Sequence, residues 1–269
     1  MKQVLAFLDT FKSELSFSSI STAKAALSAF ITLDGKPLGQ NRYVNQYMTG
    51  LAKSLPRAPK YSEIWDPQIV LDFLRKWSPS KLLNLYQLTL KTAVLILLVT
   101  AQRPQILGKL NLEQMKHAKR TFTFTVTSNL KHQRGYAPAT VIQLKAFPAD
   151  RRLCVENYVR AYIARTKNLR QVQDLFVTTT KPHGKASLAT ISRWVKTTLQ
   201  LAGINTKTFG AGSTRAAVAN KAYDHGVPVE TILKKACWAR ESTFTKWYKK
   251  EVKIKVPDFQ SVILSQKKS

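Results

Sequence analysis

Acidic residues are the scarcest class in this sequence relative to their usual abundance. The 269 residues include 43 Lys and Arg but only 15 Asp and Glu, which gives a formal net charge of +28. Charged residues make up 22% of the chain, close to the ~25% of an ordinary globular domain, so only the sign of the charge is unusual. This imbalance excludes a surface of balanced ion pairs and indicates a polyanionic partner, nucleic acid before an anionic membrane surface.

Cysteines and long apolar runs are also scarce. Cys154 and Cys237 are the only cysteines and form no Cys-x-x-Cys motif, which argues against zinc fingers and disulfide frameworks. The cleanest apolar run, residues 93–99, is far shorter than the ~20 residues of a membrane span. No GxxxxGK[ST] motif of a phosphate-binding P-loop occurs. We therefore expect no membrane partner, while the hydrophobic fraction of 44% is too high for a disordered basic tail.

Apolar periodicity predicts a mainly helical (α+β) protein with one small sheet. Three helices are expected in the N-terminal part, over residues 4–15, 19–31 and 41–55. Prolines and cations in the segment that follows predict an extended linker. We place the boundary there, between a domain of residues 1–58 and a domain of residues 59–269.

The second domain combines a buried helix with a predicted β-hairpin. Strict alternation over 121–127 and a second candidate over 139–144 predict two strands, which the polar turn 128–138 would join. The remaining elements are expected as follows: a helix capped by Asp66-Pro67, a core helix over 82–100, helices over 152–165, 187–201 and 213–225, two shorter ones after Pro228, and a short strand at 175–179.

The shortage of acids also bears on chemistry. Metal-dependent nucleases cluster carboxylates around one or two cations, and the second domain has no DxD, no HExxH and no close acidic pair. We therefore expect no metal and no other cofactor. A metal-free phosphodiester reaction would instead aim guanidinium and ammonium groups at the phosphate and use a side-chain nucleophile.

Five residues offer such a set. Arg103 follows the buried helix, Lys131 lies in the predicted hairpin turn, and Arg215 lies at a helix start, where cations are usually disfavoured. Trp238 precedes Tyr248, which three lysines surround; a free tyrosine has a pKa near ~10, so a nucleophilic one needs cationic neighbours. Taken singly, a helix-end cation, a solvated turn lysine and core aromatics explain these residues as well.

The ordered set Arg103, Lys131, Arg215, Trp238 and Tyr248 resembles the tyrosine recombinase (phage integrase) family. That family uses an Arg, a hairpin Lys, a His-x-x-Arg pair, a His or Trp, and a nucleophilic Tyr near the C-terminus. Segments 181–183, 190–194 and 241–244 are similar to its eukaryotic branch, carried by Crypton-, DIRS- and Ngaro-type mobile elements. The resemblance covers residues 61–251 well and the N-terminal helices more loosely.

The resemblance implies a SAM-like helical core-binding domain and a catalytic domain that together clamp DNA. Tyr248 would attack the phosphate and form a 3′-phosphotyrosyl bond, Arg103 and Arg215 would hold the phosphate, Lys131 would protonate the leaving oxygen, and Trp238 would hydrogen-bond a non-bridging oxygen. Strand exchange through a Holliday junction would follow without metal or cofactor. The implied partners are double-stranded DNA with inverted half-sites and further copies of this chain, a dimer per site and a tetramer in synapsis. The implied setting is the nucleus, where the enzyme would integrate or excise a mobile element.

One position departs from the family pattern. Gly212 stands where the His of His-x-x-Arg is expected, and glycine supplies no imidazole. Loss of one acid–base group typically costs ~10²–10⁴-fold in rate. Three interpretations are open: slower activity, since type IB topoisomerases also lack this His, a degenerate or domesticated copy, or an engineered change.

Further DNA contacts and rival functions complete the predictions. Arg134, Arg193 and Lys196 are candidates for DNA binding, although a solvated face explains them nearly as well. The rivals to a strand-exchange enzyme are a catalytically weak or inactive DNA-binding protein on the same fold and a type IB topoisomerase-like nicking-closing enzyme. An RNA-binding protein is a fourth interpretation, without an RNP-like aromatic strand to support it.

Overall fold

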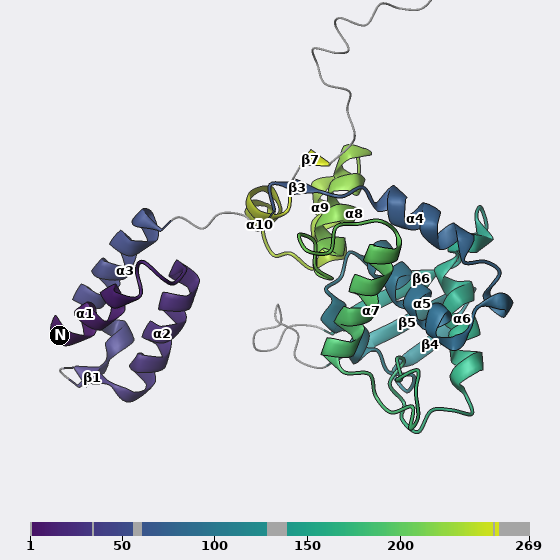
Figure 1. The fold of residues 1–269 in the computed structure, drawn as a ribbon, viewed down its shortest axis with the longest axis horizontal. Helices are drawn as coiled ribbons and strands as arrows, with labels where there is room; N and C mark the ends of the chain where they lie inside the picture. Colours follow the sequence, from purple (N-terminus) through teal and green to yellow (C-terminus); the bar gives the residue numbers. More distant parts are fainter. Residues whose placement is uncertain (1, 34, 56–60, 128–138, 250, 253–269) are drawn as a thin grey trace, which may run out of the picture. The chain divides into compact units, whose positions relative to one another are not determined.

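The computed structural model describes residues 2–33, 35–55, 61–127, 139–249 and 251–252. It divides into two compact units, Met1–Lys60 and Tyr61–Ser269, which we describe separately (Figure 1). The predicted boundary after residue 58 lies outside the described residues.

Unit 1 is a bundle of three helices around a small core. Ser16 and Asn41 cap α2 and α3, since their side chains accept hydrogen bonds from backbone N–H groups of the first turns. The elements are α1 (Lys2–Thr10), α2 (Phe17–Phe30), β1 (Thr32–Leu33), β2 (Lys36–Pro37), η1 (Leu38–Gln40) and α3 (Arg42–Ser54). All three predicted helices form, but the first ends at Thr10 because the next residues form turns instead. The buried core consists of Leu8, Ile20, Leu38, Val44, Met48 and Leu51.

Unit 2, in its described residues, surrounds one buried helix with six others and a three-stranded sheet. Its helices are α4 (Pro67–Lys76), α5 (Leu85–Thr100), α6 (Val155–Thr166), α7 (Leu188–Leu201), α8 (Ser213–Asp224), α9 (Val229–Ala236) and α10 (Glu241–Trp247). Shorter 3-10 turns are η2 (Ser80–Leu82), η3 (Pro104–Lys109) and η4 (Arg151–Leu153). The strands are β3 (Glu63–Ile64), β4 (Met115–Ala118), β5 (Thr121–Val126), β6 (Thr140–Lys145) and β7 (Glu251–Val252).

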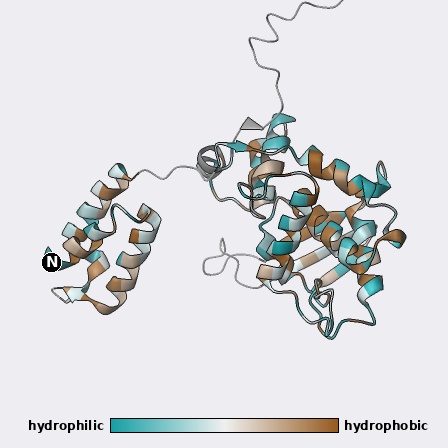
Figure 2. Cartoon of the chain, in the orientation of Figure 1, coloured by the Kyte–Doolittle hydropathy of each residue, from teal (hydrophilic) through white to brown (hydrophobic). Residues whose placement is uncertain are grey.

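The central helix is α5, and its sequence explains why. It is apolar on all sides, a pattern typical of a helix buried on every face, and it packs against α6, α7, α8 and β6 (Figures 1 and 2). Asn84 and Gln87 form a capping box at its start, and Ala101 ends it in the left-handed conformation at φ 54°. This abrupt end sets the position of Arg103, two residues later.

Lys91 is the one cation inside α5, and it is fully buried. Its Nζ atom donates to the backbone oxygens of Leu74 and Trp77, both at 2.6 Å, and lies 3.9 Å from the centroid of the Tyr158 ring. Burial lowers the pKa of Lys91 to about 7. The lysine therefore satisfies carbonyls at the end of α4 and joins that helix to the core.

The sheet follows the predicted alternation. Phe122, Phe124 and Val126 of β5 point inward, and β5 pairs antiparallel with β6, with Val126 opposite Thr140. Both predicted strands are thus confirmed, and β4 adds an edge strand that the sequence did not indicate. The predicted turn 128–138 lies outside the described residues.

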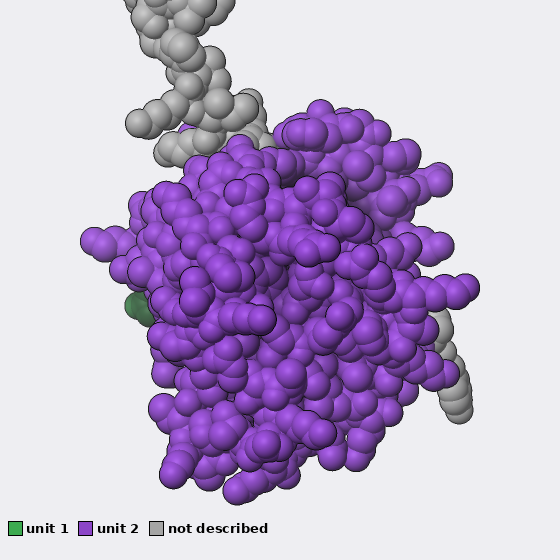
Figure 3. All heavy atoms as spheres, turned by 90° about the vertical axis from the view of Figure 1, so that its right-hand side faces the viewer, with its two compact units in different colours: residues 1–60 green, residues 61–269 purple. Residues whose placement is uncertain are grey.

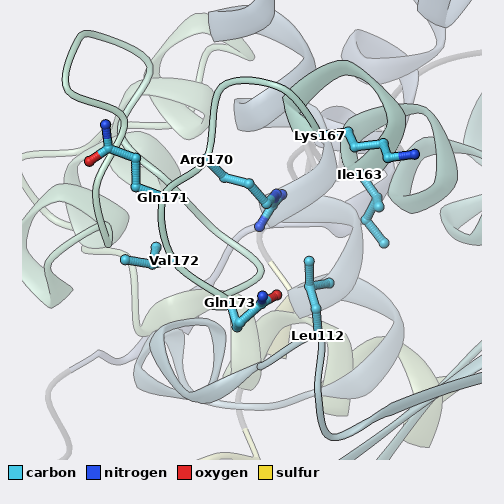
Figure 4. Close-up of a pocket in the computed structure, with 7 residues that line it drawn as sticks. All are labelled: Leu112, Ile163, Lys167, Arg170, Gln171, Val172 and Gln173. Carbon is cyan, nitrogen blue, oxygen red and sulfur yellow. The ribbon is translucent and has the colours of Figure 1, made fainter.

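The predicted strand at 175–179 is wrong. Within the described residues this segment forms an isolated bridge, between Val177 and Lys185, and belongs to no strand ladder. Arg170 holds the preceding loop instead, since its guanidinium donates to the backbone oxygens of Asp174 and Leu175 at 2.7 and 3.3 Å. This arginine lies at a surface pocket of about 370 Å³ (Figure 4), and its role here is to support the loop.

Ion pairs tie other surface segments of unit 2 together. Asp150 accepts hydrogen bonds from the side chains of Arg152 and Arg75, which hold the pKa of its carboxyl well below the usual value and join η4 to α4. On the side where α4 and α6 lie, the described residues of unit 2 form one continuous surface (Figure 3). No helix in the described parts of the chain has the length and apolar character needed to span a bilayer.

Candidate active site

The first turn of α8 carries Arg215, and a buried hydrogen-bond chain fixes where that turn begins. The indole Nε1 of Trp65 donates to Ser213 Oγ at 2.9 Å, and Ser213 Oγ donates to the Gly210 backbone oxygen at 2.7 Å. Trp65 belongs to the segment just before α4, so distant parts of the chain hold this helix start. Arg215 is consequently held in one place with only 1% of its surface exposed.

The guanidinium of Arg215 is buried without an acidic partner among the residues that the structure describes. Its Nη1 atom donates at 3.4 Å to the backbone oxygen of Ala101, while Nε and Nη2 are buried with no hydrogen-bond partner among the described residues. Burial lowers its pKa to about 10, and the charge of Arg103 acts in the same direction, against smaller opposing contributions from Tyr248 and Cys237. The site therefore holds a desolvated cation with two donor atoms, Nε and Nη2, that find no acceptor in the described part of the chain.

Two aromatic rings lie against this guanidinium. Trp238 follows α9 after Cys237, which adopts the left-handed conformation at φ 51°, and its ring centroid lies 4.5 Å from Arg215 Cζ. Tyr248 follows α10, with its ring centroid 5.8 Å from Arg215 Cζ and 4.3 Å from the Trp238 ring. The indole Nε1 of Trp238 is a third buried N–H without a partner among the described residues.

Arg103 completes the group. It is half-buried at the start of η3, directly after the end of α5, and its charge lowers the pKa of Arg215. The structure thus brings Arg103, Arg215, Trp238 and Tyr248 together from four different segments. Lys131 and Arg134 lie outside the described residues, so their positions stay predictions.

The remaining predicted residues lie on exposed surfaces. Gly212 is the N-cap residue of α8 at φ −71°, and a Cβ atom added there would meet no heavy atom within 4 Å among its neighbours. Arg193 and Lys196 are exposed on α7 and form no ion pair with any described residue. Position 212 therefore has room for a side chain, and the α7 cations are available to a partner.

The geometry fits an oxyanion held by N–H donors. Burying a cation without a counter-charge costs several kcal/mol in typical proteins, and leaving buried N–H donors without acceptors adds to that cost. An anion with several oxygens would satisfy Arg215 Nε, Arg215 Nη2 and Trp238 Nε1 together. In the described parts of the chain, no group of three or more His, Cys, Asp or Glu residues is placed to hold a metal ion.

Two buried amides at this site were not predicted from the sequence. Gln102 donates from Nε2 to the backbone oxygen of Lys235, and Asn220 donates from Nδ2 to the backbone oxygen of Tyr248. Gln102 adjoins Arg103 in the sequence, and this position next to a candidate site residue is a weak indication that it belongs to the site. For Asn220 no local pattern indicates the contact with Tyr248, because the two residues are 28 positions apart.

Comparison with known proteins supports the fold. Neither a protein-family model nor a curated protein matches the sequence. Among solved structures, XerH site-specific recombinase bound to palindromic difH substrate matches with a TM-score of 0.60 at 14% identity, over 90% of this chain and 66% of that chain. The fold of this chain is that of the tyrosine recombinases.

Two further structures agree. A λ integrase dimer bound to a COC′ core site matches with a TM-score of 0.54 at 13% identity, over 93% of this chain and 64% of that chain. The Tn1549 transposon integrase in complex with transposon right end DNA matches with a TM-score of 0.57 at 15% identity, over 90% of this chain and 79% of that chain. This chain spans just under two thirds of the XerH and λ integrase chains. The predicted fold class is confirmed, while the eukaryotic mobile-element branch stays a prediction.

Proposed function

We propose that this chain is a DNA strand-exchange enzyme, a recombinase or integrase that cuts and rejoins double-stranded DNA through a phosphotyrosyl intermediate. The observation that carries the proposal is the buried Arg215 guanidinium, stacked on Trp238 and facing Tyr248. Two of its donor atoms and the Trp238 indole N–H have no acceptor among the described residues. A phosphodiester supplies the missing acceptors. The net charge of +28 and the recombinase fold support DNA as its source.

Each residue then takes one role. Arg215 and Arg103 hold the non-bridging oxygens and offset the charge that builds in the transition state. Tyr248 Oη attacks phosphorus as its proton passes to solvent, and the bond from phosphorus to the 5′ oxygen breaks. Lys131 protonates the departing 5′ oxygen, and the indole N–H of Trp238 binds a non-bridging oxygen. The phosphotyrosyl bond conserves the energy of the broken bond, so rejoining needs no ATP.

The wider reaction follows from the intermediate. A 5′-hydroxyl from another strand attacks the phosphotyrosyl bond and produces strand exchange through a Holliday junction. Among the similar structures is a λ integrase tetramer bound to a Holliday junction, and we propose the same arrangement here, with a dimer on inverted half-sites and a tetramer in synapsis. The two units would clamp the duplex, with Arg134, Arg193 and Lys196 on its backbone. The motifs at 181–183 and 241–244 support a nuclear enzyme that integrates or excises a mobile element.

Gly212 favours a second candidate function. Without an imidazole at this position, the chain would serve as a DNA-binding protein with weak or no strand cleavage. A type IB topoisomerase-like enzyme, which nicks and recloses without exchanging partners, is the third candidate. Relaxation of a supercoiled plasmid without joint molecules would favour it over strand exchange.

The test begins with a binding site. The Tyr248→Phe variant, which keeps the ring but lacks the nucleophile, is used to select duplexes from a random pool. The selected sequence is then built into a nicked suicide substrate and incubated with wild-type protein in EDTA. We expect a protein–DNA adduct that survives denaturation in the wild type and is absent in Tyr248→Phe.

The outcomes separate the candidates. An adduct that persists in Tyr248→Phe would overturn the assignment of the nucleophile. Tight, salt-sensitive binding without any adduct, in the wild type and in Gly212→His alike, would favour the DNA-binding protein. Adduct formation that stops in EDTA would contradict the metal-free mechanism.

A further inference from the structure

The two helices that precede Trp238 and Tyr248 share an unusual feature at their C-terminal ends. The last carbonyls of a helix have no partner within the helix and need one from elsewhere. At the end of α9, Gln102 Nε2 donates to the Lys235 backbone oxygen at 2.6 Å. At the end of α10, Asn220 Nδ2 donates to the Tyr248 backbone oxygen at 2.5 Å. A buried side-chain amide therefore caps each helix just where its aromatic residue follows.

Each amide comes from a segment that also carries one of the two arginines. Gln102, 3% exposed, immediately precedes Arg103 and also donates to the sulfur of Cys237 at 3.4 Å. Asn220, 1% exposed, lies on α8 five residues after Arg215. Its Nδ2 group also donates to the Ala216 backbone oxygen at 2.7 Å, which fixes the orientation of the amide.

We propose that Gln102 and Asn220 are positioning residues that align the Trp238 indole and the Tyr248 phenol with the two guanidinium groups. The inference rests on the proposed function and extends it to residues that touch neither DNA nor the reacting atoms. Gln102 holds the α9 end against the Arg103 segment, and Asn220 holds the Tyr248 backbone against the Arg215 helix. Alignment matters because a displacement of ~1 Å in a reacting group can cost ~10²-fold in rate.

The α10 segment has little local support of its own. It has seven residues, too few for a helix that is stable by itself, and its Arg240 N-cap provides no side-chain hydrogen bond. Phe244 anchors it by packing against Trp238 and Tyr223, with ring centroids 5.6 Å apart in both pairs. Apolar packing is not directional, so it tolerates sliding, whereas a hydrogen bond from a fixed amide sets one register.

The test uses near-isosteric variants of the full chain that remove the donors. Gln102→Met and Asn220→Leu keep the volume of each side chain but cannot donate to the carbonyls. The matched control is Thr198→Val on α7: Thr198 is fully buried and donates only within its own helix, to the Trp194 oxygen at 3.0 Å. Each amide variant loses two hydrogen bonds and the control loses one. A purely structural role predicts lower stability in all three variants and a wild-type rate of adduct formation in each.

Two quantities are measured on the nicked suicide substrate: the rate of adduct formation at saturating DNA and the dissociation constant for DNA. We expect the rate to fall ~10–10²-fold in Gln102→Met and Asn220→Leu while the dissociation constant stays unchanged. Thr198→Val should lower the melting temperature and keep the wild-type rate. Wild-type rates in both amide variants, with an active wild-type protein, would overturn the positioning proposal and leave the proposed function standing.

A second measurement does not depend on activity. Amide hydrogen exchange followed on peptides covering residues 237–249 should accelerate in Gln102→Met and Asn220→Leu and stay slow in Thr198→Val. If the wild type forms no adduct, the proposed function fails, and this exchange pattern still decides the positioning role. Unchanged exchange in both amide variants would overturn it.

Discussion

The guanidinium carbon of Arg215 lies 4.5 Å from the centroid of the Trp238 ring. Cation–π stacking stabilises such a pair by ~0.5–2 kcal/mol, which is less than the cost of burying an arginine away from any carboxylate. The remaining cost is present in the protein without ligand and is relieved when an anion binds. This relationship links the fold to the proposed function, since the protein maintains an unfavourable charge at the place where the proposal puts a phosphate.

The first prediction concerns the stabilisation of the protein by an anion bound to Arg215. Phosphate ions should raise the melting temperature of the wild type by binding to Arg215, and the shift should be much smaller in Arg215→Met. Calorimetry at constant ionic strength measures it. Because phosphate also stabilises proteins through exclusion from their surfaces, Arg120→Met, at an exposed turn, serves as the control and should keep the full wild-type shift. Equal shifts in all three proteins would contradict anion binding at Arg215.

The second prediction concerns position 212. Gly212→His should speed adduct formation, up to the ~10²–10⁴-fold that a positioned acid–base group supplies, because the imidazole assists proton transfer at the phosphate. The surroundings allow the change, since an added Cβ meets no neighbour within 4 Å. Gly212→Ala controls for the change in backbone freedom and should retain the wild-type rate. A wild-type rate in the His variant would show that this position does not limit the reaction.

The third prediction concerns the exposed cations of α7. Replacing Arg193 and Lys196 by Gln should weaken DNA binding for all sequences. The slope of log K against log salt should become shallower by about 0.9 for each phosphate that the variant no longer neutralises. Titrations at several salt concentrations measure this slope. Lys167→Gln, an exposed cation at the pocket around Arg170, is the control and should leave the slope unchanged. An unaltered slope in the double variant would exclude phosphate binding by α7.

The fourth prediction concerns Lys91 and pH. In the unfolded chain this lysine keeps its proton up to its ordinary pKa of 10.5, whereas in the folded protein burial lowers the pKa to about 7. Folding therefore releases a proton between these values, so the free energy of unfolding rises with pH above about 7, by at most ~1.4 kcal/mol per pH unit. Urea titrations at several pH values measure this slope.

Lys91→Met isolates that contribution. The variant should be less stable overall, because the backbone oxygens of Leu74 and Trp77 each lose the hydrogen bond from Lys91 Nζ. Its stability should nevertheless depend less on pH above about 7 than that of the wild type. The same pH slope in both proteins would refute the proposed proton release.

Much of the fold was predictable because the sequence patterns that specify its helices and strands are local. The mainly apolar sequence of α5 and the alternation of β5 each specify an element and its buried face within a few residues. Edge strand β4 escaped prediction because its residues are mostly exposed and show no alternation. The apolar run at 175–177 was misinterpreted because burial alone does not distinguish a strand from an irregular segment held by a side chain, here Arg170.

The sequence by itself determined the charge, the helical class and the order of the site residues along the chain, since composition, periodicity and spacing are properties of one dimension. Only the tertiary structure decided that Arg215 is buried, with no counter-charge in the described part of the chain, and that Trp238 and Tyr248 stack beside it. Packing also decided that Gln102 and Asn220 cap the helices before those rings, through hydrogen bonds that span 133 and 28 residues of sequence. Desolvation and hydrogen-bond partners depend on what surrounds a side chain in space, and those neighbours come from distant parts of the sequence.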